Sequence, residues 1–172
     1  MPQTDQRTIA DHLREVERDY DDQIRPIESY GPLVAAFNAA FGGFLVAYAR
    51  SGRKLPEHVS AGDVVLLATA THKLSRIITK DRVMSFARAP FTRFQRPSGH
   101  GEVEEEARGE GLRRGIGELL VCPYCLSVWI AGGFVGALLV APRETRVVAG
   151  VFSAVAISDG LQLAYRAAED RV

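Results

Sequence analysis

Residues 119–141 read LLVCPYCLSVWIAGGFVGALLVA and contain no charged side chain. A helix of this length, at about 1.5 Å per residue, reaches across the roughly 30 Å hydrocarbon core of a bilayer. A chain of 172 residues rarely needs so long an uncharged run in a soluble core. The stretch therefore predicts a membrane-spanning helix. Near its start lie the only two cysteines of the chain, Cys122 and Cys125.

Three more apolar stretches predict further helices, at residues 33–49, 64–79 and 147–165. The stretch 64–79 is the most polar of them, because His72, Lys73 and Arg76 follow its apolar first half. A charged side chain that faces lipid at mid-bilayer costs at least about 2.5 kcal/mol. This helix therefore either spans with its polar face buried in the bundle or only dips into the membrane. The pattern predicts an all-α integral membrane helical bundle of about four transmembrane helices within residues 33–166, with a three-helix bundle as the alternative.

Polar segments flank and separate these helices. Apolar residues at steps of three and four within residues 5–24 predict an amphipathic helix, so that residues 1–32 form a cytoplasmic helix and linker. No basic segment followed by a short apolar stretch precedes the first apolar run, so no cleavable signal peptide is predicted. Residues 80–117 form a long, charged, glycine-containing loop in which a short helix around 102–108 is expected, and residues 167–172 form a tail.

The distribution of Lys and Arg predicts the orientation. These residues concentrate in the N-terminal segment, in the loop 80–117 and in the tail, and fewer lie in residues 50–60 and 142–146. Because cytoplasmic loops carry an excess of Lys and Arg, four spanning helices would place both termini in the cytoplasm. The sequence therefore predicts a multi-pass protein of the bacterial plasma membrane with its long loop on the cytoplasmic side.

This orientation gathers the polar intramembrane residues on one side of the membrane. The predicted cytoplasmic-side cluster consists of Asn38, His72, Lys73, Arg76 and Asp159. A buried carboxylate needs a partner, and the cations of residues 64–79 are the obvious candidates for Asp159. The cluster either locks a small bundle together or forms a polar pocket for a headgroup, an ion or a small substrate.

The Cys122-Pro-Tyr-Cys125 tetrapeptide leaves three interpretations open. The pair could cycle between dithiol and disulfide, with Cys122 at a helix N-terminus as the nucleophile. It could supply two ligands of a zinc site, completed by His72 and His100 or by a second subunit. It could also consist of two small buried residues without chemistry. The tetrapeptide matches a glutaredoxin active site, but that fold needs a βαβ context, and the sequence shows none.

The loop 80–117 begins with arginines interleaved with phenylalanines. This composition is found at nucleic-acid interfaces, but beside a bilayer the arginines can bind anionic headgroups while the phenylalanines enter the interface. We therefore expect no nucleic acid and predict anionic-lipid contacts at Arg82, Arg88, Arg93 and Arg96. The acidic run that follows, Glu102 to Glu106, is expected to be solvated or paired with these arginines.

Several segments resemble a bacterial membrane-protein family of unknown function, DUF1360, which includes YjcA-like sporulation-associated proteins. The resemblance rests on ATHKLSRIITKDRV (70–83), RAPFTRF (88–94), GEVEEEARGEGLRRGIGELLVCPYCLSVW (101–129) and Ser158-Asp159. It covers roughly residues 33–166. It implies a small integral membrane protein, and it supplies no catalytic residues.

These observations favour a non-enzymatic scaffold or accessory protein whose polar cluster at the cytoplasmic face binds lipid, a ligand or a partner. The alternative is a membrane thiol protein that uses Cys122 and Cys125 for redox chemistry or zinc binding. A third hypothesis is a small transporter-like bundle with His72 and Asp159 as a proton relay. The expected partners are membrane lipids and, through the GxxxG spacing of Gly132 and Gly136, a second copy or a partner membrane protein. No cofactor other than zinc is expected.

Overall fold

The computed structural model describes residues 27–171. The amphipathic helix predicted within residues 5–24 lies outside the described residues. Along the chain the elements are α2 (Ile27–Arg50), α3 (Ala61–Lys80), η1 (Arg82–Met84), α4 (Ser85–Arg88), β1 (Thr92–Gly99), β2 (Glu102–Ala107), α5 (Gly111–Val121), α6 (Pro123–Val140) and α7 (Pro142–Glu169).

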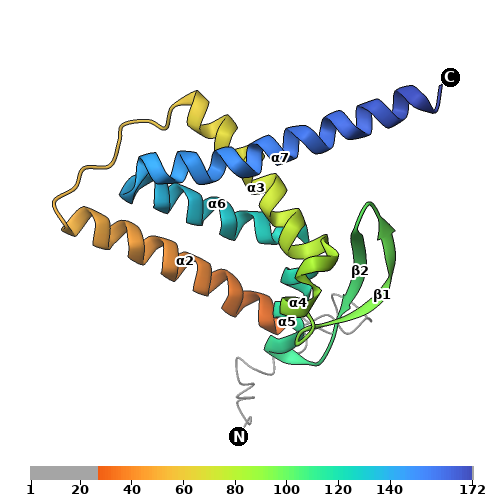
Figure 1. Ribbon diagram of the computed structural model, residues 1–172. Helices are drawn as coiled ribbons and strands as arrows, with labels where there is room; N and C mark the ends of the chain where they lie inside the picture. Colours follow the sequence, from red (N-terminus) through yellow and green to blue (C-terminus); the bar gives the residue numbers. More distant parts are fainter. Residues whose placement is uncertain (1–26, 172) are drawn as a thin grey trace, which may run out of the picture.

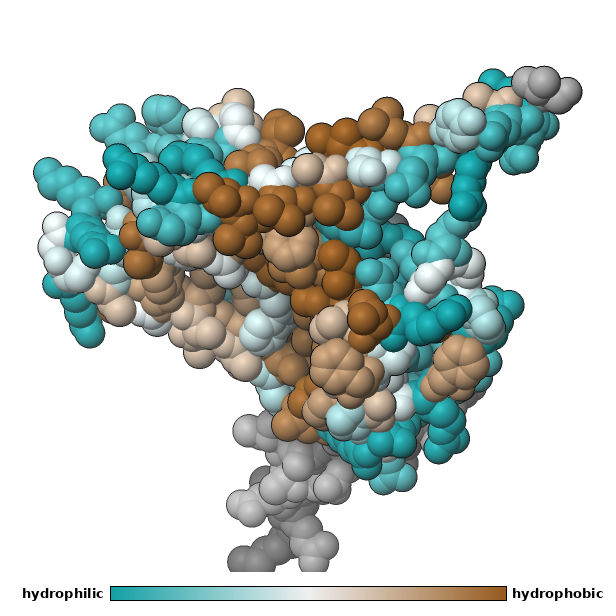
Figure 2. Space-filling model, viewed as in Figure 1, coloured by the Kyte–Doolittle hydropathy of each residue, from teal (hydrophilic) through white to brown (hydrophobic). Residues whose placement is uncertain are grey.

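Four long helices, α2, α3, α6 and α7, run between two ends of the molecule (Figure 1). One end carries residues 51–60 and the turn between α6 and α7, and the other carries α5 and the β1–β2 hairpin. Polar residues cover these two ends, and a band of apolar residues lies between them over α6 and α7 (Figure 2). Among the described residues, three helices are long and apolar enough to cross a membrane: Ser29–Arg50, Pro123–Val140 and Pro142–Glu169. The fourth predicted span, 64–79, forms α3 but does not belong to that group.

The apolar stretch 119–141 is divided between two helices rather than forming one. α5 ends at Val121, and Cys122 adopts an extended conformation as the N-cap of α6. Pro123 occupies the first turn of α6, where its missing N–H costs nothing, but it cannot continue a helix that arrives from α5. The expected single helix is therefore wrong at its start, and the apolar helix spans Pro123–Val140.

α3 lies at the centre of the bundle. The buried core contains Leu67 and Ala70 of α3, Phe134 and Leu138 of α6, and Ala149 of α7. Close contact of α3 with α7 is possible because Ala70 and Ala149 are both fully buried small residues. The hydroxyl of Ser153 on α7 donates to the carbonyl of Leu66 on α3 at 2.8 Å. These contacts bury one face of α3 against α6 and α7.

The other end of α3 is tied to α7 by an ion pair. Ser60 caps α3 by accepting a hydrogen bond from the backbone N–H of Asp63. The Asp63 carboxylate accepts two hydrogen bonds from Arg146, at 2.7 and 2.9 Å. The pair fixes the first turns of α3 and α7 to each other.

The GxxxG glycines of α6 pack within the bundle. A Cβ added at Gly132 would meet the Phe37 ring at 3.1 Å, and one added at Gly136 would meet the Phe44 ring at 3.5 Å. Trp129, one helical turn before Gly132, contacts Phe37 edge-on with ring centroids 5.3 Å apart. α2 therefore uses its phenylalanines to pack on the glycine face of α6, the close approach that small residues permit.

The loop 80–117 contains a β-hairpin, so the all-α prediction is wrong here. β1 and β2 pair antiparallel with Arg93 opposite Glu106 and Arg96 opposite Glu104. The helix expected around 102–108 is instead the strand β2. Pairing the basic half of the segment with its acidic half brings opposite charges together across the strands, which favours a hairpin over a helix of adjacent glutamates. The turn is made by Gly99, His100 and Gly101, all with positive φ.

Candidate functional site

A polar cleft of about 850 Å³ opens between α3, α7 and the turn of the hairpin. From α3 it is lined by His72, Lys73 and Arg76, the three residues predicted there. α7 contributes Asp159 and Arg166, among others, and the hairpin side contributes Asp81, Arg82, His100 and Glu102. We refer to these nine residues as the cleft residues. The predicted convergence of the second and last apolar stretches on one polar site is therefore present in the fold.

Lys73 and Asp159 form an ion pair across the cleft. Lys73 Nζ lies 2.7 Å from an Asp159 carboxylate oxygen, which joins α3 to α7. The expectation that a cation of residues 64–79 pairs with Asp159 is confirmed. The Lys73 side chain is 15% exposed and that of Asp159 46% exposed, so the carboxylate faces the open cleft and is not sealed inside the bundle.

Arg76 links α3 to the hairpin. Its guanidinium donates to both carboxylate oxygens of Glu102, at 2.7 and 2.6 Å from Nη2, and Nε donates at 3.1 Å. Glu102 is the first residue of β2 and also forms an isolated bridge with Asp81, the residue that ends α3. The hairpin turn is therefore held over the end of α3 by a fork-shaped, charge-assisted contact.

Two cleft arginines are not neutralised by carboxylates among the described residues. Arg166 of α7 lies 2.8 Å from Nδ1 of His100 at the hairpin turn. Because a guanidinium can only donate, Nδ1 accepts this bond and the imidazole carries its proton on Nε2. Arg82 is exposed, and its backbone N–H donates to the carbonyl of Gly101. Both guanidinium groups are thus free to bind an anion in the cleft.

The third carboxyl group of the cleft is that of Asp81. Burial raises its pKa; repulsion from Glu102 and Asp159 acts in the same direction, and attraction by Lys73 and Arg76 opposes it. With Lys73 paired to Asp159 and Arg76 paired to Glu102, the remaining charged groups are Arg82, Arg166 and this carboxyl. The electrostatic balance of the cleft is therefore positive.

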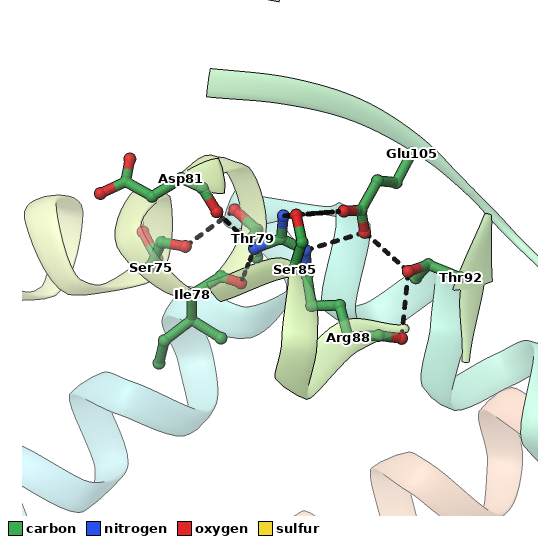
Figure 3. A network of polar contacts seen from close by, with 8 residues as sticks. All are labelled: Ser75, Ile78, Thr79, Asp81, Ser85, Arg88, Thr92 and Glu105. Atoms are coloured by element: carbon green, nitrogen blue, oxygen red, sulfur yellow. Dashed lines mark hydrogen bonds and ion pairs between the residues drawn. The ribbon is translucent and has the colours of Figure 1, made fainter. Parts of the chain in front are cut away.

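Arg88 is not a lipid-contacting residue. Its side chain is 1% exposed and forms an ion pair of 2.9 Å with Glu105, which is 4% exposed. It also donates to the carbonyls of Ile78 and Asp81, as Figure 3 shows. The prediction of anionic-lipid contact at Arg88 is wrong, because every direction of its guanidinium is already used to join the end of α3 to the hairpin.

The network of Figure 3 also explains the charge state of Glu105. Burial alone would raise the pKa of this carboxyl group, but hydrogen bonds from Arg88, Thr92 and Ser85 outweigh that effect and hold the pKa below its ordinary value. Of the other arginines predicted to contact lipid, Arg82 lines the cleft, Arg93 is exposed, and Arg96 pairs with Glu104 at 2.7 Å on the hairpin surface. The expected pairing of the acidic run with the loop's own arginines is thereby confirmed.

Asn38 and the cysteines do not join the cleft. The Asn38 amide donates to the carbonyl of Val34 within α2. Cys122 and Cys125 form a disulfide, so neither offers a thiolate to a metal in this state. Among residues 27–171, no group of three or more His, Cys, Asp or Glu side chains lies together as a metal site. His72 and His100 line the cleft without the cysteines, and the predicted tetrahedral zinc set is therefore not assembled.

The sequence does not predict three cleft residues: Asp81, Glu102 and Arg166. Asp81 and Glu102 both lie within residues 80–117, where the sequence predicts a loop, and only strand pairing brings Glu102 to the end of α3. The sequence nevertheless contains a signal for this hairpin. Basic residues, Arg93 and Arg96, precede a Gly-His-Gly turn, and acidic residues, Glu104 and Glu106, follow it.

Comparison with known proteins identifies relatives of the part that builds the cleft. The model of a family described as "Protein of unknown function (DUF1360)" matches residues 66–165. The "Sporulation protein YjcA" of Bacillus subtilis (strain 168) is 34% identical over 86 residues, which cover 48% of this chain and 73% of that protein. No solved structure matches. The matched range contains eight of the nine cleft residues and the disulfide, and it ends one residue before Arg166.

Proposed function

The chain belongs to the DUF1360 family, whose description assigns no activity, so we propose its function from the cleft. We propose that it is an integral membrane accessory protein that binds an anionic, phosphate-bearing ligand at the hairpin end. The single observation that carries the proposal is the positive cleft beside apolar helices, in which no carboxylate of residues 27–171 neutralises Arg82 or Arg166. No group in it is arranged as a nucleophile with a base, and we assign it no catalytic step.

The membrane assignment is supported by the exposure of the apolar helices. In the three helices long and apolar enough to span, at most 11% of the residues in the apolar window are buried. Val147, Val151 and Leu161 of α7 are 59–70% exposed. Soluble monomers rarely expose contiguous apolar patches larger than a few hundred Å². A bilayer around these helices would cover the exposed apolar surface and remove it from contact with water.

We further propose that α3 crosses the membrane as a fourth helix. Its 20 residues extend about 30 Å, the thickness of a bilayer core. Three of its four hydroxyl side chains are satisfied locally, because Thr69, Ser75 and Thr79 donate to α3 carbonyls. Its charges are paired near the cleft end. In this arrangement the apolar neighbours α6 and α7 shield the polar face of α3, and the hairpin and both termini lie in the cytoplasm.

Anion binding can be tested in detergent micelles with glycerol 3-phosphate, a soluble phosphomonoester. We expect millimolar glycerol 3-phosphate to raise the unfolding temperature of the protein, because a ligand that binds only the folded state stabilises it. The double substitution Arg82→Gln and Arg166→Gln should abolish this rise. Arg143→Gln, an exposed arginine at the opposite end of α7, should keep it. No rise in the wild type, or equal rises in both variants, would refute the proposal.

A second candidate function rests on the disulfide. Cys122 Sγ accepts a hydrogen bond of 3.1 Å from the backbone N–H of Cys125 at the N-terminus of α6. After reduction, the same position would stabilise a Cys122 thiolate through the helix dipole. In the proposed reaction an external dithiol attacks the Cys122–Cys125 disulfide. The external thiols leave joined as a disulfide, and the protein gains two electrons and two protons as its cysteines become free thiols. A thiol probe should label the protein only after treatment with dithiothreitol; equal labelling before and after would remove this candidate.

From the name of the Bacillus relative we also propose sporulation as the process. Deletion of the gene in a spore-forming host should lower the count of heat-resistant spores, and expression of the double arginine variant should not restore it. If that variant restored the spore count, the role in sporulation would not depend on anion binding in the cleft.

A further inference from the structure

A second cavity lies on the other side of α3. It is an apolar groove of about 780 Å³ between α2, α3 and α6. Its walls include Phe37 and Phe41 of α2, Leu67 of α3, and Val128 and Val135 of α6. α2 packs on α6 through Gly132 and Gly136, and the groove is lined by these two helices together with α3. The volume falls in the range of cavities that bind small molecules.

The groove and the polar cleft share two residues. His72 and Arg76 line both cavities, and because they are four residues apart they lie on one face of α3. The positively charged cleft and the apolar groove therefore adjoin each other at these two side chains. An amphiphile could place its charged group on one side of this pair and its apolar part on the other.

The groove runs in the direction of a lipid chain. Along α3 its lining extends from Arg76 back to Val64, which corresponds to about 18 Å of helix. This length is comparable with half of the roughly 30 Å bilayer core. A chain that starts at the cleft would thus point from the hairpin end toward the middle of the membrane.

The junction also contains polar groups without partners. Thr71 Oγ1 is buried and has no hydrogen-bond partner among the described residues, and Thr71 lines the groove. A buried hydroxyl that makes no hydrogen bond is costly. No described residue hydrogen-bonds to the His72 ring, which lines both cavities. The His72 ring is exposed and can donate to the ester carbonyls that lie between the phosphate and the chains of a glycerophospholipid, whereas the Thr71 hydroxyl lies beneath the groove surface.

From these observations we propose that the ligand is a membrane phospholipid with an exposed phosphate, held with its headgroup in the cleft between Arg82 and Arg166 and one acyl chain in the groove between α2, α3 and α6. The His72–Arg76 face of α3 separates the two parts, and the His72 ring donates to the ester region. This inference rests on the proposed anion-binding function and names its ligand class.

The test uses the full-length protein in phosphatidylcholine nanodiscs that contain a trace of phosphatidic acid with a photoactivatable diazirine on one acyl chain. After irradiation, mass spectrometry maps the labelled residues. We expect labels at groove residues such as Tyr124 and Val128, and fewer on the outer face of α7 at Val147 and Val151. A phosphatidylcholine probe with the same chain measures nonspecific contact.

Each arginine near a membrane surface contributes about a fivefold preference for an anionic lipid. Arg166→Gln should therefore lower groove labelling by phosphatidic acid about fivefold, while Arg143→Gln leaves it unchanged. Ala68→Phe, at an exposed position that lines the groove, should remove labels at Val128 but keep the stabilisation by glycerol 3-phosphate. Ala154→Phe, an exposed position on α7, is the matched control and should keep both.

Three outcomes would overturn the inference. Equal groove labelling by the phosphatidic acid and phosphatidylcholine probes would mean that the cleft does not select the lipid. No groove labelling by either probe would mean that a protein segment or a second copy covers the groove. Unchanged labelling in Ala68→Phe would place the chain elsewhere. In each case stabilisation by glycerol 3-phosphate reports separately on the anion site, so the proposed function stands or falls by its own measurement.

Discussion

Replacement of Arg88 by methionine tests whether the buried ion pair holds the hairpin over the cleft. Methionine keeps most of the apolar stem but removes the guanidinium. The substitution deletes two hydrogen bonds to Glu105 and one each to the carbonyls of Ile78 and Asp81. It leaves Glu105, only 4% exposed, without its cation.

The magnitude follows from what remains around Glu105. Loss of one partner of a buried ion pair costs about 3–5 kcal/mol. The hydroxyls of Ser85 and Thr92 still donate to the carboxylate, at 2.9 and 2.6 Å, so we expect the lower end, about 3 kcal/mol. Since each 1.4 kcal/mol is a factor of ten, the amide hydrogens of residues 92–107 should exchange more than about 100-fold faster. Glu105→Leu added to the same variant should recover part of this loss, because it removes the unpaired carboxylate.

Hydrogen–deuterium exchange in nanodiscs, read by mass spectrometry, measures this opening directly. Arg93→Met is the matched control, because Arg93 is exposed on the same hairpin and should change exchange by less than a factor of about five. An increase of less than tenfold in Arg88→Met would refute the argument that the pair fixes the hairpin. Equal increases in both variants would show that any lost arginine loosens this segment.

The network should also respond to acid. The pKa of Glu105 is lowered in the folded protein, so its ionised form contributes stability that is fully present above the ordinary carboxyl pKa. This contribution is lost as the pH falls through the lowered value. Exchange of the hairpin amides should therefore accelerate below about pH 4 in the wild type. In Arg88→Met burial dominates and holds the pKa of Glu105 above its ordinary value, so acidification should slow this exchange instead of accelerating it. Acceleration of the same size in both proteins would contradict this cause.

Three further outcomes follow from packing and charge in the bundle. Gly117→Ala should destabilise the protein by about 1–3 kcal/mol, because the new Cβ would lie 2.5 Å from the Phe91 carbonyl oxygen; Gly133→Ala, with nothing within 4 Å, should not, and thermal unfolding in micelles compares the two. Arg146→Met should loosen the first turn of α3, because it removes both hydrogen bonds that Arg146 donates to Asp63, and faster amide exchange in this turn would detect the change. Ser153→Ala should cost about 0.6 kcal/mol, read as a lower SDS concentration at the unfolding midpoint.

Hydropathy and charge patterns predicted much of the helical frame. The stretches 33–49, 64–79 and 147–165 all lie within observed helices, because an apolar or amphipathic run of this length has few other ways to satisfy its backbone. The start of α6 could not be predicted from apolarity, since Cys122 and Pro123 are themselves compatible with an apolar run. The break depends on proline geometry and on the N-cap conformation of Cys122.

The cleft was predicted in part. Lys73 and Asp159 were recognised because a carboxylate in an apolar helix requires a cation, and they pair at 2.7 Å. Arg88 was misassigned because a basic residue in a polar loop is usually exposed, and only strand pairing brings Glu105 to it. Cys122 and Cys125 left three chemical interpretations open, and the structure joins them in a disulfide.

Local chemistry along the chain determined where the long helices lie and which of their residues must find polar partners, because hydropathy and charge act at each position regardless of the fold. The antiparallel pairing of residues 92–99 with 102–107 depends on contacts between residues far apart in the sequence. So do the burial of Arg88 and the meeting of the cleft and the groove at His72 and Arg76. Only the tertiary structure decided these features, since each arises from surfaces that come together after the helices have packed.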